Sequence, residues 1–234
     1  MFQATELSGG YLKGSQVLRG ISLALERGSV TALMGRNGMG KTTLMRAITG
    51  HLPHLSGSMR LNDQELTKRA AFQVAQLGVG YVPQGRDIFA DFSVEENLMM
   101  GVLGKPGLSR TLPEWAWTTF PVLAERRRQR AGTMSGGQQQ QLAIMRALVG
   151  RPQLLLLDEP SEGIQPSIVM EIGATIRRIA AEQGLAVLLV EQNLDLVRAM
   201  AGRCLFIESG AIADAAEVDA LHADAPLVRR YLSA

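Results

Sequence analysis

The segment GRNGMGKT, residues 35–42, constrains the fold of this chain more than any other part of it. It matches the pattern G-x-x-x-x-G-K-[ST], a loop that joins the end of a strand to the start of a helix. Both neighbours are present, because an apolar run, Val30–Met34, precedes the segment and a helical pattern, Thr43–Thr49, follows it. The alternative, a glycine-rich turn before an ordinary helix, needs every fixed position of the pattern to coincide by chance. We therefore expect a strand–loop–helix unit here.

Such a loop suits a polyphosphate, because phosphate oxygens need many N–H donors at close range and glycine lets the backbone approach them. The positive end of the following helix dipole adds to the attraction. Lys41 would reach the β- and γ-phosphates of a nucleotide, and the hydroxyl of Thr42 would bind Mg²⁺. The residues that we expect to contact the nucleotide through this loop are Gly35, Arg36, Asn37, Gly38, Met39, Gly40, Lys41, Thr42 and Thr43.

A second candidate site ends the run LLLLDEP, residues 154–160. Consecutive leucines without polar alternation predict a strand that is buried on both faces, as in the middle of a parallel sheet. Ligands of parallel sheets bind at the carboxyl ends of the strands, where Asp158 and Glu159 stand. Asp158 would hold Mg²⁺, and Glu159 could orient or deprotonate an attacking water. The alternative is a solvated loop in which Pro160 ends the strand.

The remaining pattern predicts an α/β fold. Short apolar runs alternate with helical patterns in residues 1–84 and 151–234, which we interpret as an α/β core with a mostly parallel sheet. Residues 85–150 contain no convincing strand, and we expect them to form an inserted helical subdomain. The chain has 234 residues, of which 46% are hydrophobic, so both parts fit into a single large domain, residues 1–234.

Capping and turn residues predict where individual helices and strands lie. Ser93 and Glu96 have the spacing of a capping box, which starts a helix inside the expected subdomain. Gly104, Pro106 and Gly107 mark a loop behind that helix. The expected helices are Gly40–Thr49, Val94–Gly101, Gly136–Val149, Pro166–Glu182 and Leu194–Ala201. The expected strands are Phe2–Leu7, Ser22–Leu25, Val30–Met34, Ser58–Leu61, Gly80–Val82, Leu154–Asp158, Leu185–Val190 and Cys204–Ile207.

Charge and cysteine content narrow the class of protein. The net charge of +2 gives no electrostatic reason to expect a nucleic-acid partner. A basic run, Arg126–Arg130, lacks interleaved aromatic side chains, and we interpret it as a solvated helix face or a subunit contact. The single cysteine, Cys204, excludes an internal disulfide and fits a reducing compartment. No apolar run approaches the roughly 20 residues of a transmembrane helix, so we expect any membrane role to be exerted from the cytoplasmic side through partners.

A third motif, MSGGQQQQ, which we call the signature segment, occupies residues 134–141 and opens a helix. Ser135 and Gln138 have the spacing of a second capping box, and two glycines at a helix start expose donors that suit a further phosphate. Chain geometry alone does not say whose phosphate this is.

Taken in order, GRNGMGKTT, SGGQQ and LLLLDEP resemble the ATP-binding-cassette (ABC) ATPases, and the resemblance covers essentially the whole chain.

This resemblance implies a P-loop NTPase core with N-terminal antiparallel strands, ATP and Mg²⁺ as ligands, and two cassettes that pair head to tail. Tyr11 occupies the place of the aromatic residue that stacks on adenine, although it could be an ordinary surface or core tyrosine. Gln84, in YVPQGRDIF, resembles the glutamine that contacts Mg²⁺ and links the core to the helical subdomain, although it could be an ordinary loop residue. The γ-phosphate held by one cassette would be enclosed by the signature residues of the other, Ser135, Gly136, Gly137 and Gln138.

The chain also resembles one branch of importer ATPases, through the segments VPQGRDIF, SVEENL, SEGIQPSIV and VLLVEQN. That branch energises the uptake of branched-chain and other amino acids, and of urea and short amides; the glutamine run and the segment Glu162–Pro166 lean toward urea and amides. The implied partners are membrane-spanning permease subunits, a second ABC ATPase subunit and, indirectly, a periplasmic solute-binding protein. The implied location is the cytoplasmic face of the inner membrane, as a peripheral subunit.

Two residues depart from the general cassette pattern. Gln192 stands where most cassettes carry a histidine that contacts the γ-phosphate, and Gln165 stands where most carry an aspartate. A glutamine can donate a hydrogen bond but carries no positive charge, so hydrolytic competence is in question. We count Glu159, Gln84 and Gln192 as the candidate catalytic residues. The alternatives are a soluble ABC ATPase without a transport role and a cassette that holds nucleotide without turnover.

Overall fold

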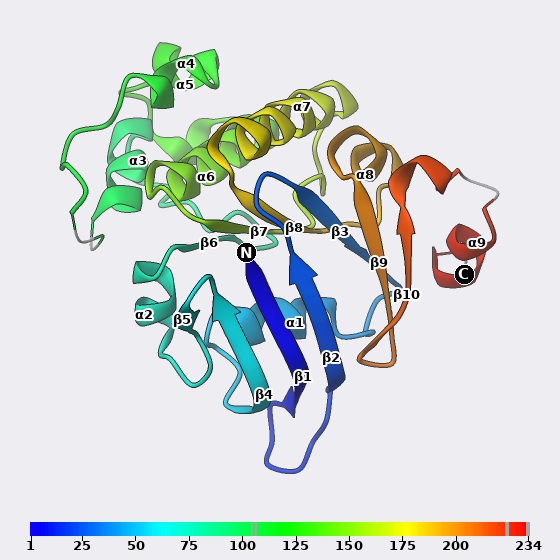
Figure 1. The fold of residues 1–234 in the computed structure, drawn as a ribbon. Coiled ribbons are helices and arrows are strands. Elements are labelled where there is room, and N and C mark those ends of the chain that lie inside the picture. The colour runs from blue at the N-terminus through cyan, green and yellow to red at the C-terminus, as the bar shows by residue number, and fades with distance from the viewer. Residues whose placement is uncertain (104, 106, 223–224, 233–234) are drawn as a thin grey trace.

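The computed structural model describes residues 1–103, 105, 107–222 and 225–232. Two β-sheets lie at an angle to one another, and most of the helices are gathered on the side of the larger sheet that faces away from the smaller one (Figure 1). Gly104 and Pro106, which we expected in a loop, lie outside the described residues, whereas Gly107 lies in a turn with φ +80°.

The larger sheet has the strand order β10-β9-β3-β8-β7-β6, in which β10 is antiparallel to β9 and every other pair is parallel. Strands β3, β7 and β8 are buried at every position, which explains their apolar sequences. The carboxyl ends of β3, β7 and β8 therefore meet at one edge. The strands are β3 (Val30–Met34), β6 (Val79–Val82), β7 (Leu154–Asp158), β8 (Ala186–Val190), β9 (Arg203–Glu208) and β10 (Ala211–Glu217).

The smaller sheet is antiparallel, in the order β2-β1-β4-β5, so the expected antiparallel strands at the N-terminus are confirmed. Its apolar side chains and those of helices α1 and α2 form one hydrophobic core with the near face of the larger sheet. The elements are β1 (Phe2–Gly10), β2 (Leu18–Leu25), β4 (His54–Leu61), β5 (Gln64–Glu65), α1 (Lys41–Ile48) and α2 (Ala71–Gln76).

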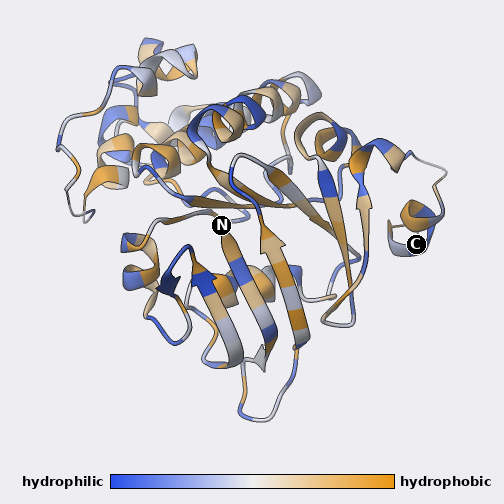
Figure 2. Ribbon diagram, viewed as in Figure 1, coloured by the Kyte–Doolittle hydropathy of each residue, from blue (hydrophilic) through white to orange (hydrophobic). Residues whose placement is uncertain are grey.

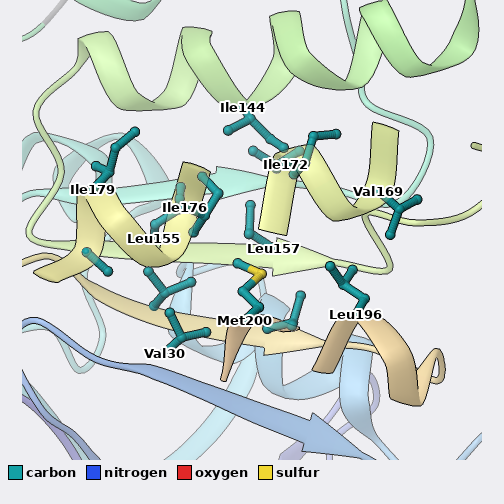
Figure 3. Packing of buried hydrophobic residues seen from close by; sticks show 14 of the residues in the cluster. Val30, Ile144, Leu155, Leu157, Val169, Ile172, Ile176, Ile179, Leu196 and Met200 are labelled. Atoms are coloured by element: carbon teal, nitrogen blue, oxygen red, sulfur yellow. The ribbon is translucent and has the colours of Figure 1, made fainter. Parts of the chain in front are cut away.

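A second hydrophobic core covers the other face of the larger sheet. Figure 3 shows Ile144 of α6 and Ile172 of α7 packed above Leu155 and Leu157 of β7. Orange residues run along the central strands in Figure 2, whereas the covering helices alternate orange and blue, as amphipathic helices do. The helices on this side are α3 (Val94–Val102), α4 (Trp115–Thr118), α5 (Pro121–Glu125), α6 (Gly136–Val149), α7 (Pro166–Gln183), α8 (Leu194–Met200) and α9 (Pro226–Leu232), with short 3-10 turns η1 (Ala131–Thr133) and η2 (Val218–Ala220).

Within the described part of residues 85–150, the structure contains helices α3 to α6 and no strand beyond one isolated bridge between Ser93 and Arg130. The boundaries of a subdomain at residues 85 and 150 stay a prediction. Both capping boxes are confirmed: Ser93 accepts from the backbone N–H of Glu96 at 3.2 Å, and the box at the start of α6 is formed as expected. The sequence did not indicate β5, β10, α2, α5 or α9, which are short or amphipathic only in part.

Candidate nucleotide site

The glycine-rich loop joins β3 to α1 as its sequence pattern requires. Gly40 stands at the N-cap of α1 with φ +107°, a conformation that favours glycine. Gly35 passes so close to β9 that a Cβ atom would lie 2.5 Å from the carbonyl oxygen of Ile207. These two glycines let the backbone curve tightly into α1, whose first N–H groups, as in any helix, have no acceptor within the helix and can donate to an anion.

The side chain of Lys41 folds back onto the loop and holds it in this curve. Its Nζ donates to the carbonyl oxygens of Gly35 at 2.7 Å and of Arg36 at 3.0 Å, and the residue is only 5% exposed. Burial lowers the pKa of Lys41, while the nearby carboxylates of Glu159 and Asp158 raise it and so offset part of that effect. The loop therefore presents a buried cation at the point where the sequence expects phosphate.

Asp158, at the end of β7, is 2% exposed. Its Oδ2 accepts a hydrogen bond from Tyr81 Oη at 3.3 Å, and its carboxyl group also interacts with the Thr42 hydroxyl. Burial, and then the negative charge of Glu159, raise the pKa of Asp158 to about 6. The other oxygen, Oδ1, is buried without a hydrogen-bond partner. Such an orphaned oxygen is costly unless a donor or a cation meets it.

The donor set suits Mg²⁺, which prefers hard oxygen ligands and takes one or two carboxylates together with phosphate oxygens. Thr42 and Asp158 supply a hydroxyl and a carboxylate at one place. In the described part of the chain, no group of three or more His, Cys, Asp or Glu side chains could hold a metal. A cation here would depend on the nucleotide for much of its coordination.

Glu159 occupies a left-handed backbone conformation with φ +47°, and its N–H donates to the carbonyl oxygen of Val190 at 2.9 Å. Such a conformation in a non-glycine residue persists only where the surroundings fix it. Two amide side chains hold the carboxylate: Gln192 Nε2 donates to Oε1 at 2.8 Å and Gln84 Nε2 donates to Oε2 at 3.3 Å. Gln192 Nε2 also donates to Asn37 Oδ1 at 3.0 Å, which connects Glu159 with the glycine-rich loop.

These groups surround one cavity of about 480 Å³. The cavity brings together the glycine-rich loop, Glu159 of the acidic pair and two of the glutamines that the sequence singled out; Asp158 is not among its lining residues but interacts with Thr42, which is. Its lining residues are Asn37, Gly38, Gly40, Lys41, Thr42, Thr43, Gln84, Glu159, Glu162 and Gln192.

Tyr11 lies beside the cavity, on the loop that follows β1. Its Oη and the Thr43 hydroxyl are 3.2 Å apart, and the guanidinium of Arg46 lies 5.5 Å from the ring centroid. With 41% of its surface exposed, the ring is fixed at its polar end and open to solvent along its body. This placement suits a base that stacks on it while the phosphates reach the glycine-rich loop.

The signature residues Ser135, Gly136, Gly137 and Gln138 are not among the residues that line the cavity. Ser135 caps α6 through Gln138, whose N–H donates to Ser135 Oγ at 3.4 Å. Gly137 is buried, and a Cβ atom there would lie 2.6 Å from Ile168. The cavity of this chain is therefore lined without the signature residues, and their role across an interface stays a prediction.

The other singled-out residues have structural surroundings. Cys204 lies on β9 and is buried in the core between the larger sheet and its covering helices, and burial raises the pKa of its thiol to about 12. Arg127, in the basic run, pairs with Glu95 and lies 4.7 Å from the ring centroid of Trp117. Gln165 stands at the N-cap of α7 and is exposed.

Sequence reasoning missed Glu191, which is 2% exposed. One oxygen accepts from the N–H of Ser161 at 2.9 Å, and the other accepts from Gln192 at 2.9 Å and from Asn193 at 3.0 Å. It therefore ties the loop after β7 to the loop after β8. A charged residue directly behind a buried strand was the available signal. Sequence reasoning also missed Tyr81, which donates to Asp158, and Glu162, which accepts from Gln84.

Comparison with known proteins agrees with this geometry. A family model described as "ABC transporter" matches residues 18–162. The high-affinity branched-chain amino acid transport ATP-binding protein BraG of Pseudomonas aeruginosa is 41% identical over 84% of either chain. The probable branched-chain amino acid transport ATP-binding protein LivF of Archaeoglobus fulgidus is 33% identical over 91% of this chain and 90% of its own.

Solved structures show the same fold. The ADP conformation of MJ1267, an ATP-binding cassette of an ABC transporter, superposes with a TM-score of 0.80 at 25% identity, over 98% of this chain and 97% of that one. A dimeric post-hydrolysis state of the cassette MJ0796, bound to ADP and Pi, superposes with a TM-score of 0.82 over 93% and 99%; at 19% identity it shows the fold alone. Together with the cavity, these matches show that this chain belongs to the ABC transporter family and is one of its ATPases.

Proposed function

We propose that this chain is the ATP-hydrolysing subunit of an importer, with MgATP bound in the cavity between the glycine-rich loop and the acidic pair. The observation that carries the proposal is the meeting of buried Lys41 and doubly hydrogen-bonded Glu159 around one space of about 480 Å³, together with the contact between the buried Asp158 carboxyl and Thr42, which lines that space. Tyr11 stacks on the base, and the loop from Gly35 to Thr43 holds the phosphates.

Thr42, Asp158 and Gln84 would hold Mg²⁺, which neutralises charge on the phosphate oxygens when it is bound. Glu159 orients the attacking water and accepts its proton on a carboxylate oxygen. Both carboxylate oxygens already accept amide N–H groups, so the carboxylate has a fixed orientation before the nucleotide arrives. Preorganisation of this kind lowers the cost of reaching the transition state.

Gln192 keeps a neutral donor at the place where most cassettes carry a histidine. Both N–H groups of its amide are engaged, one with Glu159 and one with Asn37, which favours a role in positioning Glu159; donation to the γ-phosphate would require a phosphate oxygen to replace Asn37 as acceptor. A donor without charge supplies less transition-state stabilisation than a cation, so we expect slow turnover at this site. A second candidate function, nucleotide binding without turnover, follows from the same residue.

Turnover and binding, measured separately, decide between these two functions. We expect the purified chain to bind MgATP and to release phosphate slowly, because the γ-phosphate is enclosed only when Ser135 and Gly137 arrive from a second cassette. Phosphate release should rise with protein concentration, or with a partner ATPase, and should disappear in Glu159→Gln. Binding without any phosphate release at high concentration would favour the holding function. Fast release that is independent of concentration would contradict the cross-interface arrangement.

We further propose permease subunits, a second cassette of the same or a different chain, and a periplasmic solute-binding protein as partners. The chain would act as a peripheral subunit at the cytoplasmic face of the inner membrane. In the described residues, no helix has the length and apolar character needed to cross a bilayer. Dimeric cassettes among the solved structures of this fold support the pairing.

For the solute, we propose branched-chain or related amino acids, because the relatives at 41% and 33% identity are named for branched-chain amino acid transport. The test is uptake of labelled leucine, urea and acetamide by cells in which Glu159→Gln replaces the natural chain. Loss of leucine uptake alone supports the proposal. Loss of urea or acetamide uptake instead would favour the urea and amide side of this branch, toward which the glutamine run and the segment Glu162–Pro166 lean.

A further inference from the structure

Arg86 lies two residues after Gln84, in a left-handed conformation with φ +74°. Its guanidinium makes two hydrogen bonds to different parts of the chain: Nη2 donates to the carbonyl oxygen of Glu162 at 3.2 Å, and Nη1 donates to Gln139 Oε1 at 3.3 Å. The carbonyl oxygen of Arg86 accepts from Arg146 Nη2 at 3.2 Å. Both its backbone and its side chain are therefore attached to helix α6.

The contact with α6 lies at the signature segment. A Cβ atom at Gly136 would lie 3.1 Å from both terminal nitrogens of Arg86, so the guanidinium sits directly against the first turn of the helix. Gln139, which accepts from Arg86, also donates to the carbonyl oxygens of Met134 at 3.1 Å and of Ala131 at 3.3 Å. A displacement of Arg86 would therefore disturb the hydrogen bonds that hold the backbone just before Ser135.

The other contact leads back to the nucleotide cavity. Gln84 Nε2 donates to Glu162 Oε2 at 3.0 Å and to Glu159 Oε2 at 3.3 Å, and all three side chains line the cavity. Arg86 holds the carbonyl oxygen of that same Glu162. A continuous series of hydrogen bonds thus runs from Glu159 to the start of α6. If Gln84 turned toward a bound metal ion, Glu162 would lose its partner.

We propose that Arg86 is a positioning residue that transmits nucleotide occupancy of this chain's own cavity to the signature segment, which it presents to a second cassette. The inference rests on the proposed function, because it takes the cavity to be the ATP site. The planar fork of arginine suits the task, since it holds two acceptors in a fixed mutual geometry that a lysine ammonium does not impose. One cassette would thereby adjust the surface that completes its neighbour's site according to its own ligand.

The test is amide hydrogen exchange of the full chain with and without Mg²⁺ and the non-hydrolysable analogue AMP-PNP, followed in peptides that cover residues 134–142. In the wild type, nucleotide changes the exchange of these peptides, and Arg86→Ala loses this response. Nucleotide affinity of the variant stays within about twofold of wild type, because Arg86 does not line the cavity. Arg86→Lys keeps the charge without the fork and also loses the response.

Arg178→Ala is the matched control, because Arg178 is an exposed arginine on α7 that pairs with Glu182 at 3.0 Å. It should keep the full response. Gln139→Leu breaks the series at its other end and should abolish the response even if Arg86→Ala fails to fold. A response that persists in Arg86→Ala or Gln139→Leu, or that is absent in the nucleotide-bound wild type, would overturn the proposal. Failure of the wild type to bind nucleotide would refute the proposed function instead.

Discussion

Replacing Asp158 by asparagine should stabilise the chain when neither metal nor nucleotide is present. The Asp158 carboxyl is 2% exposed, and burial together with the negative charge of Glu159 raises its pKa from 3.8 to about 6. Because its pKa is higher in the folded than in the unfolded chain, the folded chain binds the proton more tightly. The free energy of unfolding therefore falls as the pH rises from about 4 to about 6 and stays low above that range.

The size of the effect follows from the same shift. Roughly two pKa units at about 1.4 kcal/mol each give a cost of about 3 kcal/mol for the ionised Asp158 at neutral pH. Asparagine has the same shape and no charge, and its carbonyl oxygen can still accept from Tyr81 Oη. Its amide group would take the place of the unpaired Oδ1 and would lack an acceptor, which offsets part of the gain in the free energy of unfolding. We expect a net stabilisation of about 1–3 kcal/mol.

Urea unfolding in EDTA measures this at pH 7.5 and again near pH 4, with wild type and Asp158→Asn side by side. The variant should be more stable at the higher pH, and the difference should shrink toward pH 4 as the wild-type carboxyl becomes protonated. With Mg²⁺ and ATP the order should reverse, because a ligand stabilises only the chain that binds it. A variant no more stable than wild type at pH 7.5, or a gain of equal size at pH 4, would refute the reasoning.

Three further substitutions test separate parts of the site. Lys41→Ala should remove most MgATP affinity, because the buried ammonium is the main point charge at the phosphates; calorimetric titration should show it, and an affinity near that of wild type would contradict the assignment. Tyr11→Ala should weaken ATP and ADP binding equally, by about 1–3 kcal/mol, because stacking senses the base; weakening confined to ATP would speak against stacking. Glu159→Gln should lower turnover at least about 10²-fold while ATP still binds; unchanged turnover in a phosphate-release assay would move the catalytic role elsewhere, with Gln192 the first residue to test.

The sequence predicted the parts of the fold whose signals are local. The phosphate-loop pattern and the unbroken apolar run of β7 each fix the nature of their element within a few residues. Strand β10 could not be predicted in this way, because its residues Ala211–Glu217 include few β-branched or aromatic side chains and its burial is partial. It forms as the second strand of a hairpin with β9, across the two-residue turn of Ser209 and Gly210, whose residues both have positive φ; this Ser-Gly pair was the available signal.

In the candidate site, too, local sequence patterns predicted some residues and missed others. Lys41, Asp158 and Glu159 were singled out because each follows a buried strand or sits in a spaced pattern, and parallel topology gathers strand ends at one edge. The glutamine and arginine contacts depend on loop conformations instead. Arg86 and Glu159 both occupy left-handed backbone conformations, which sequence propensity does not foresee for residues with side chains.

The buried carboxylate of Glu191 determines how the two sides of the cavity can move. It accepts backbone N–H groups from Ser161 on one connection and from Gln192 and Asn193 on the other. Thermal displacements of the two connections are therefore correlated, and Glu159 travels together with Gln192. The glycine-rich loop belongs to the same unit, because β3 pairs with β8 up to Leu33 and Val190, and the N–H of Glu191 donates to the carbonyl oxygen of Leu33 at 3.3 Å. The carboxyl ends of β3, β7 and β8 therefore hold the walls of the cavity as one connected unit, so a nucleotide enters a site whose loops are already joined to one another.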